Sequence, residues 1–156
     1  MFTVPAVPTR LTLGPGWETV QESGGRVAAD LRVRRGGGNG VTVDVRLERC
    51  VSGRLRDTYP VGAHDVEVRI GAGCPQDVRP ALLRAVREAV QAADPRCRRV
   101  VHAVPVGEGE WTAAAESAGF RYAVDVDLGL EQLGLLVAEP DWVTGPDLDL
   151  DRVPGA

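Results

Sequence analysis

The chain has 156 residues, the length of one domain, and 44% of its residues are hydrophobic and 26% charged, as in an ordinary globular protein. A chain of this size buries about 70% of the surface that it exposes when unfolded, so its core needs neither a disulfide nor a metal. The net charge of −4 argues against nucleic acid as the main partner.

Cysteines, histidines and hydropathy limit the kind of site and the compartment. The cysteines, Cys50, Cys74 and Cys97, lack the spacing of a metal motif, and His64 and His102 are the only histidines. This predicts reduced thiols and no metal site. No apolar run approaches about 20 residues, and the first residues do not form a basic stretch followed by an apolar one. We therefore expect a cytoplasmic protein without a membrane span or a secretory signal.

The first third of the chain is predicted to form strands. After a proline-containing arm over residues 1–16, a short strand is expected over Trp17–Gln21. Hydrophobic and polar residues alternate over Arg26–Arg34 and again over Val41–Leu47, which is typical of strands with one buried face. The glycine-rich residues 36–40 between them indicate a turn, so the two strands are expected to form a hairpin.

A strand and a helix are predicted to follow an irregular segment over residues 50–62. Residues alternate over Asp65–Ile70, which places the side chains of Asp65, Glu67 and Arg69 opposite those of Val66, Val68 and Ile70. A helix is expected from Pro80, since proline suits a first turn, to Asp94, which precedes Pro95. Its apolar residues follow a period of 3.6: Leu82, Leu83, Val86, Ala89, Val90 and Ala93.

The last part of the chain is predicted to alternate between strand and helix. A strand over Arg99–Val104 leads to a short helix that Gly119 ends, as glycine often does. Two more strands are expected over Tyr122–Leu128 and Gly134–Ala138. This order predicts the α/β (α+β) class, with one domain over residues 1–139 built on a mixed, mostly antiparallel sheet flanked by helices. Residues 140–156 contain four Asp and three Pro and are expected to form an acidic tail.

From Asp65 to Ala138 the chain resembles the GCN5-related N-acetyltransferase (GNAT) family. The resemblance rests on Leu82-Leu83 in the helix after the predicted strand, on Ala118-Gly119-Phe120 at the end of the second helix, and on the spacing between them. The last two strands and the early hairpin also fit the order of elements in that family.

The resemblance implies acetyl-CoA as the cofactor. Its pantetheine would pair with the free backbone of the strand over 65–70, as an added strand does, and its pyrophosphate would lie at the start of the next helix. The residues implied in cofactor binding are Val68, Ile70, Gly71, Gly73 and Arg79.

Two positions depart from the motifs of the family. The family's phosphate turn contains glycines, whereas Asp77, Val78, Arg79 and Pro80 occupy it here. Pro80 has no N–H, and Asp77 is expected to cap the helix and to repel phosphate, which Arg79 could offset. The family often has a tyrosine four residues before the closing glycine as the acid for the leaving thiolate, and this chain has Ala115 there.

The catalytic candidates are Glu67 as the general base for the amine and Tyr122 as a replacement for the missing acid. The alternative to a catalytic role is that Glu67 is an exposed carboxylate on the strand, and the same alternative holds for Asp65. For Tyr122 the alternative is a side chain that packs in the core. His64 is expected to be a solvated loop residue. His102 is expected to lie in the core or at a sheet edge with its hydrogen bonds satisfied, and Cys74 is expected to have a structural role only.

The sequence thus predicts an acyl-CoA-dependent N-acetyltransferase that acts by direct transfer on an unidentified amine, either a small molecule or a peptide. The alternative is a catalytically silent GNAT-fold protein that binds a metabolite or a protein partner. A homodimer is one option for the oligomeric state, and no membrane or nucleic-acid partner is expected.

Overall fold

A computed structural model describes residues 3–36 and 40–140. The predicted tail over 140–156 lies, apart from Pro140, outside the described residues, as do positions 37–39 of the predicted turn. The described elements follow one another in the order β1 (Trp17–Gly24), β2 (Ala28–Arg35), β3 (Thr42–Arg49), the short 3-10 helix η1 (Cys50–Ser52), β4 (Val66–Ile70), α1 (Arg79–Ala93), β5 (Val100–Pro105), α2 (Gly109–Ser117), β6 (Arg121–Leu128) and β7 (Glu131–Ala138).

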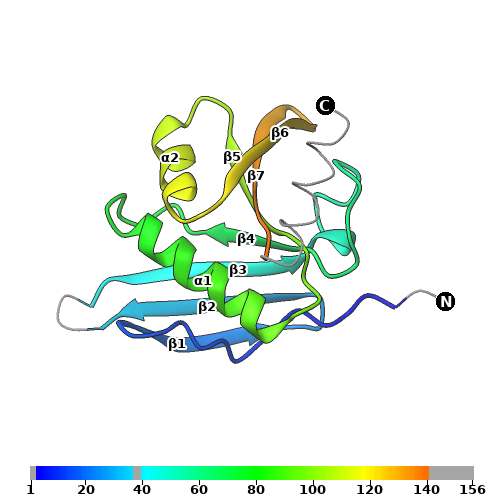
Figure 1. Cartoon of the computed structure of the whole chain (residues 1–156). Coiled ribbons are helices and arrows are strands. Elements are labelled where there is room, and N and C mark those ends of the chain that lie inside the picture. The colour runs from blue at the N-terminus through cyan, green and yellow to red at the C-terminus, as the bar shows by residue number, and fades with distance from the viewer. Residues whose placement is uncertain (1–2, 37–39, 141–156) are drawn as a thin grey trace, which may run out of the picture.

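The strands form one sheet in the order β1-β2-β3-β4-β5-β7-β6, which Figure 1 shows. All neighbours pair antiparallel except β4 and β5, which are parallel. The connection from β4 to β5 runs through α1, as a parallel pair requires. The predicted class, a mixed and mostly antiparallel sheet with helices, is confirmed.

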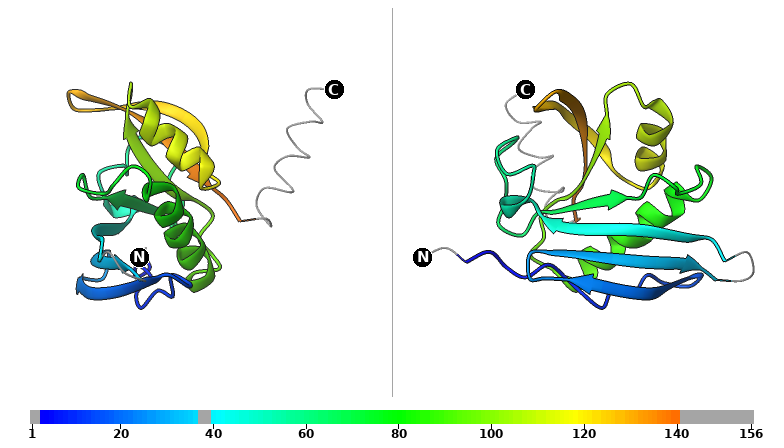
Figure 2. Two further views of the ribbon diagram at one scale, coloured as in Figure 1. Left: turned by 90° about the vertical axis from the view of Figure 1, so that its left-hand side faces the viewer. Right: turned by 180° about the vertical axis from the view of Figure 1, so that it is seen from behind.

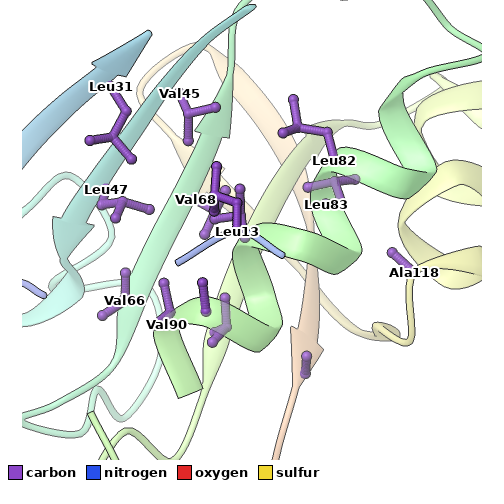
Figure 3. Packing of buried hydrophobic residues seen from close by; sticks show 14 of the residues in the cluster. Leu13, Leu31, Val45, Leu47, Val66, Val68, Leu82, Leu83, Val90 and Ala118 are labelled. Carbon is purple, nitrogen blue, oxygen red and sulfur yellow. The ribbon is translucent and has the colours of Figure 1, made fainter. Parts of the chain in front are cut away.

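The main core lies between one face of the sheet and the two helices (Figures 1 and 2). The apolar stripe of α1 packs on it, and Figure 3 shows Leu82 and Leu83 in one cluster with Val45 and Val68 of the sheet. Leu13 of the N-terminal arm joins the same cluster. A smaller cluster on the other face lies under the segment between η1 and β4, so that segment covers β5 and β7 there.

The hairpin predicted from alternation is confirmed, since β2 and β3 pair from Ala28↔Glu48 to Arg34↔Thr42. The largest differences from the predicted bounds are in two strands: β1 extends to Gly24, and β7 begins at Glu131. The added residues are exposed, except Leu133, and lack strict alternation, but the hydrogen bonds of their neighbouring strands extend the ladder over them.

A buried guanidinium fastens the N-terminal arm to the sheet. Arg49, at the end of β3, is 2% exposed, and its Nε donates to the carbonyl of Pro5 at 3.1 Å. Its Nη2 lies 2.8 Å from Oδ2 of Asp94, which follows α1, and His64 Nδ1 lies 3.0 Å from the same oxygen. His64 is therefore part of this network and not the solvated loop residue that was predicted.

Replacing Leu83 with alanine is expected to lower the free energy of unfolding by about 2–5 kcal/mol, because Leu83 is fully buried and a cavity would remain. The matched control is Leu130→Ala at a fully exposed position, which is expected to change it by less than about 0.5 kcal/mol. Urea unfolding of both variants measures the difference. Equal effects of the two substitutions would contradict the described packing of α1.

Candidate functional site

The parallel strands β4 and β5 separate part-way along their length. They pair only at Val66↔Val100 and Glu67↔Val101, although β4 continues to Ile70 and β5 to Pro105. The N–H of Val66 donates to Arg99 on the β5 side, and the N–H of Gly71 donates to Asp44 on the β3 side. Because alternate residues of a strand point their backbone groups to opposite sides, those of Val68 and Ile70 face the opening.

His102 of β5 lies at the narrow end of this opening. Its side chain is 4% exposed, and its Nδ1 lies 2.8 Å from the carbonyl oxygen of Val68. A carbonyl only accepts hydrogen bonds, so Nδ1 carries the proton and Nε2 carries the lone pair. His102 is thus a core residue, as predicted, but only one of its ring nitrogens is satisfied, because Nε2 is buried without a hydrogen-bond partner among the described residues.

A pocket of about 180 Å³ occupies the opening between the two strands. Its walls come from both faces of the sheet and from α1 and α2, so it passes between β4 and β5. The lining residues are Arg54, Arg69, Ile70, Arg79, His102, Ala103, Pro105, Trp111, Glu131 and Leu133.

Glu67 lies beside this pocket, on the face of β4 opposite to Val66 and Val68. It is 1% exposed, and its Oε2 accepts hydrogen bonds from Arg54 Nη2 at 2.7 Å and Nε at 3.2 Å. Arg69 Nε lies 3.5 Å from the same oxygen. The prediction of an exposed carboxylate at Glu67 is wrong because the segment between η1 and β4 folds over this face and supplies Arg54.

Asp65 is also buried, at 0% exposure, which corrects the same prediction there. Its Oδ2 accepts hydrogen bonds from the hydroxyl of Tyr59 at 2.8 Å and from the N–H of Gly62 at 2.9 Å. Asp65 precedes β4 and does not line the pocket. Its contacts are those of a residue that fixes the covering segment.

Arg79 begins α1 and turns its side chain into the pocket. It is 2% exposed, and its guanidinium carbon lies 4.5 Å from the centre of the Trp111 ring, a cation–π contact between α1 and α2. Burial lowers the pKa of this guanidinium. Arg79 is thus the predicted cofactor residue whose side chain contacts α2, through Trp111.

The start of α1 offers few free N–H groups. The N–H groups of Val78 and Arg79 both donate to the carbonyl of Pro75, at 3.1 and 3.2 Å, and Pro80 has none. The residue before the helix is Val78, without a side-chain cap, so the predicted cap by Asp77 is wrong. The turn over residues 75–78 already uses the donors that a side chain or an anion would need.

Tyr122 and Gly73 lie outside the pocket, while Gly71 belongs to the neighbouring hollow. Tyr122 is on the outer strand β6, 42% exposed, with its hydroxyl bonded to Asp125. Alternation predicted it to pack in the core, which is wrong because nothing described covers this edge of the sheet. A Cβ at Gly73 would meet no atom within 4 Å, so the backbone there is open to a bound group.

A second hollow of about 480 Å³ lies on the exposed face of β2, β3 and β4. Arginines and aspartates alternate across it, with Arg32 Nε 3.0 Å from Asp44 and Arg46 Nη1 3.0 Å from Asp30. It shares Arg69 and Ile70 with the pocket, so the hollow leads to the opening between β4 and β5. Its lining residues are Gln21, Ser23, Asp30, Leu31, Arg32, Asp44, Val45, Arg46, Arg69, Ile70 and Gly71.

Among the residues that line the pocket, sequence reasoning predicted only Ile70 and Arg79 as site residues. Arg54 lies in the segment predicted to be irregular, and Glu131 begins β7 before the predicted start of that strand. Trp111 packs against the main core and also lines the pocket. Over the described ranges, no three His, Cys, Asp or Glu side chains form a group able to hold a metal, and no helix is long and apolar enough to cross a membrane.

Solved structures share this architecture. An uncharacterised protein of Bacillus halodurans superposes with a TM-score of 0.58 at 19% identity, over 74% of this chain and 62% of that one. The aminoglycoside acetyltransferase AAC(6')-Ib with paromomycin and acetyl-CoA gives 0.60 at 14% identity, over 72% and 65%. The GNAT domain of S. lividans PAT gives 0.50 at 19% identity, over 71% and 61%. The chain has the GNAT fold.

The match to the GNAT fold has a limited extent. The matched part spans less than two thirds of each of these three neighbours. No family model and no curated protein matches the sequence. In the GNAT fold of this chain, the opening between β4 and β5 is the place where the predicted cofactor strand, Val66–Ile70, loses its parallel neighbour.

Acid is expected to destabilise the fold through His102. Burial lowers its pKa to about 4 from an ordinary 6.5, so between these values the unfolded chain binds a proton that the folded chain does not. Stability is therefore lost as the pH falls from 6.5 to 4, by about 3 kcal/mol from this group.

The measurement is urea unfolding at several pH values on the wild type and on His102→Asn, whose amide can still donate to Val68. The variant is expected to lose this part of the pH dependence, while carboxylates such as Asp94 act alike in both chains. Equal pH slopes between 6.5 and 4 would show that His102 titrates normally.

Proposed function

We propose that the chain is an acyl-CoA-dependent N-acyltransferase that transfers the acyl group directly to an amine. The observation that carries this proposal is the opening between β4 and β5, with a pocket passing through the sheet to the charged hollow on the other face. Support also comes from the GNAT fold and from neighbours solved with acetyl-CoA or coenzyme A.

The residues fit the pantetheine part of the cofactor. The backbone of Ile70 faces the opening beyond the last β4–β5 pair, so an extended chain can pair with it as an added strand. The carbonyl of Val68 is already bonded to His102, which leaves Ile70 as the main partner. Gly71 and Gly73 follow directly, and the open backbone at Gly73 gives room for a bound group.

The start of α1 fits a pyrophosphate less well than a glycine turn would. Its N–H groups at Val78 and Arg79 are occupied by Pro75, so side-chain charge has to replace backbone donors. Arg79 supplies a positive charge from inside the pocket, where it can meet a negative group of the bound molecule.

When bound, acyl-CoA supplies the thioester carbonyl that the amine attacks. Glu67 is assigned the role of proton acceptor for the amine, directly or through water, with Arg54 holding its carboxylate in position. The aspartates and arginines of the hollow orient an amine that also carries a negative group. Tyr122 lies outside the pocket, so its role as the acid for the leaving thiolate stays a prediction without geometric support.

Calorimetric titration with acetyl-CoA, followed by turnover against a panel of amines, tests the function. Glu67→Gln is expected to lower kcat by about 10²–10⁴-fold with little change in acetyl-CoA affinity, because it removes the proton acceptor and keeps the size of the side chain. Since it also removes the buried charge that pairs with Arg54, thermal unfolding verifies that the variant is folded. Glu116→Gln, at an exposed position of α2, is the control and is expected to keep full activity. No binding at millimolar acetyl-CoA would refute the proposal.

The second candidate is a catalytically silent GNAT-fold protein that binds a metabolite or a partner. The occupied N–H groups at the start of α1 and Ala115 in place of a tyrosine favour it. If it is right, wild-type protein will not bind acetyl-CoA, whereas the double variant Asp77→Gly and Pro80→Gly will gain affinity from the restored turn. Turnover by the wild-type protein would exclude this candidate.

A further inference from the structure

The pocket between β4 and β5 contains a buried positive charge without a carboxylate partner. The other fully buried guanidinium, that of Arg49, pairs with Asp94, and Arg54 of the pocket pairs with Glu67. The side chain of Arg79 is 2% exposed and forms no ion pair and no hydrogen bond within the described part of the chain. Its Nε is buried and unsatisfied, and its guanidinium lies over the face of the Trp111 ring.

Such an arrangement is costly without a ligand. A buried charge is normally paired, since removing its hydration is costly unless another charge or hydrogen bond replaces it. A cation–π contact replaces only part of this hydration. The arrangement at Arg79 is completed by an anion that enters the pocket and takes up the guanidinium hydrogens.

His102 adds a second unsatisfied group to the same pocket. Its Nδ1 donates to Val68, so Nε2 is a hydrogen-bond acceptor, and it has no donor among the described residues. Arg79 and His102 both line the pocket, each more than nine-tenths buried, and supply one strong donor group and one acceptor. Arg69 Nε also lacks a hydrogen bond but lies 3.5 Å from Glu67. An anion alone would satisfy only Arg79, so the complementary ligand also carries a hydrogen-bond donor.

The size of the pocket limits the ligand. Its volume of about 180 Å³ is below the range of roughly 300–1,000 Å³ that is usual for drug-sized ligands. We propose that this pocket binds a small carboxylate group with a neighbouring O–H or N–H, the carboxylate on Arg79 and the donor on Nε2 of His102. Trp111 forms the apolar wall against which this group packs.

Two sources offer this chemistry. One is a free small hydroxy acid, whose own hydroxyl is the donor, and its binding does not depend on the proposed acyl transfer. The other is the terminal carboxylate of an acidic acyl group on CoA, with an amide N–H of the pantetheine as the donor. The second source rests on the proposed function and would make the enzyme selective for carboxyacyl over acetyl groups.

The first experiment uses the free acids L-lactate and propionate, which differ chiefly in one hydroxyl, with calorimetry or NMR as the readout. Lactate is expected to bind about three- to tenfold more tightly than propionate, because only lactate can donate to His102. Arg79→Gln is expected to weaken both acids by about tenfold or more, since it removes the charged donor. Arg98→Gln, the same change at an exposed position, is the control.

Two variants separate loss of contact from loss of structure. His102→Asn can keep the bond to Val68 but lacks Nε2, so it is expected to bind both acids with the affinity that the wild type has for propionate. Arg79→Lys keeps the charge and is expected to recover part of the affinity that Arg79→Gln loses. Thermal unfolding of each variant verifies that it is folded.

The second experiment compares malonyl-CoA with acetyl-CoA in binding and turnover. A preference for malonyl-CoA that disappears in Arg79→Gln supports the acyl source. If no CoA ester binds but lactate binding depends on Arg79, the acyltransferase proposal fails and the carboxylate site stands. If acetyl-CoA is turned over while neither lactate nor malonyl-CoA binding responds to Arg79→Gln, the carboxylate site is refuted and the acyltransferase stands.

Discussion

The structure depends on the separation of two parallel strands inside a sheet. Beyond Glu67 and Val101, β4 and β5 no longer pair, and their backbone groups must find other partners because an unpaired buried N–H or carbonyl is costly. The imidazole of His102 provides one such partner, at the carbonyl of Val68. The rest of the opening stays a pocket lined by side chains, and this pocket is where the chemistry of the chain is concentrated.

The elements around the opening are arranged as the separation requires. The crossover from β4 to β5 places the start of α1, and hence Arg79, at the wide end of the opening, and α2 brings Trp111 over it. On the other face the segment after η1 lays Arg54 on Glu67. Six parts of the chain therefore meet at one pocket, namely the segment after η1, β4, α1, β5, α2 and β7, and each contributes a charged or aromatic side chain.

The sequence was sufficient to predict the elements whose hydrophobic residues recur with the period of a strand or a helix. Alternation predicted the hairpin of β2 and β3, and the 3.6-residue period predicted α1 with Leu82 and Leu83 inward. Alternation tells which residues share a face but not what covers that face. Glu67 was therefore predicted to be exposed and Tyr122 to be buried, and the opposite holds, because a loop covers the first and nothing described covers the second.

The candidate site was only partly predictable for the same reason. Ile70 and Arg79 could be predicted as site residues because they lie at the end of a strand and at the start of a helix, and the hydrophobic pattern defines both positions. Arg54 could not be predicted, because its segment has no hydrophobic periodicity. Its contact with Glu67 depends on how the loop between η1 and β4 folds over the sheet. Whether Nε2 of His102 has a hydrogen-bond partner depends on tertiary contacts, so no spacing of residues in the sequence could predict that it lacks one.

One substitution ties the departures from the family motif to the pocket. Arg79 stands where the family's phosphate turn has glycines, and its side chain fills space in the opening while the N–H groups around it bond to Pro75. A glycine there would leave the helix start open to phosphate and remove the buried charge. The residue at this position therefore weakens a backbone site for pyrophosphate and brings a positive charge into the pocket, where the proposed carboxylate would bind.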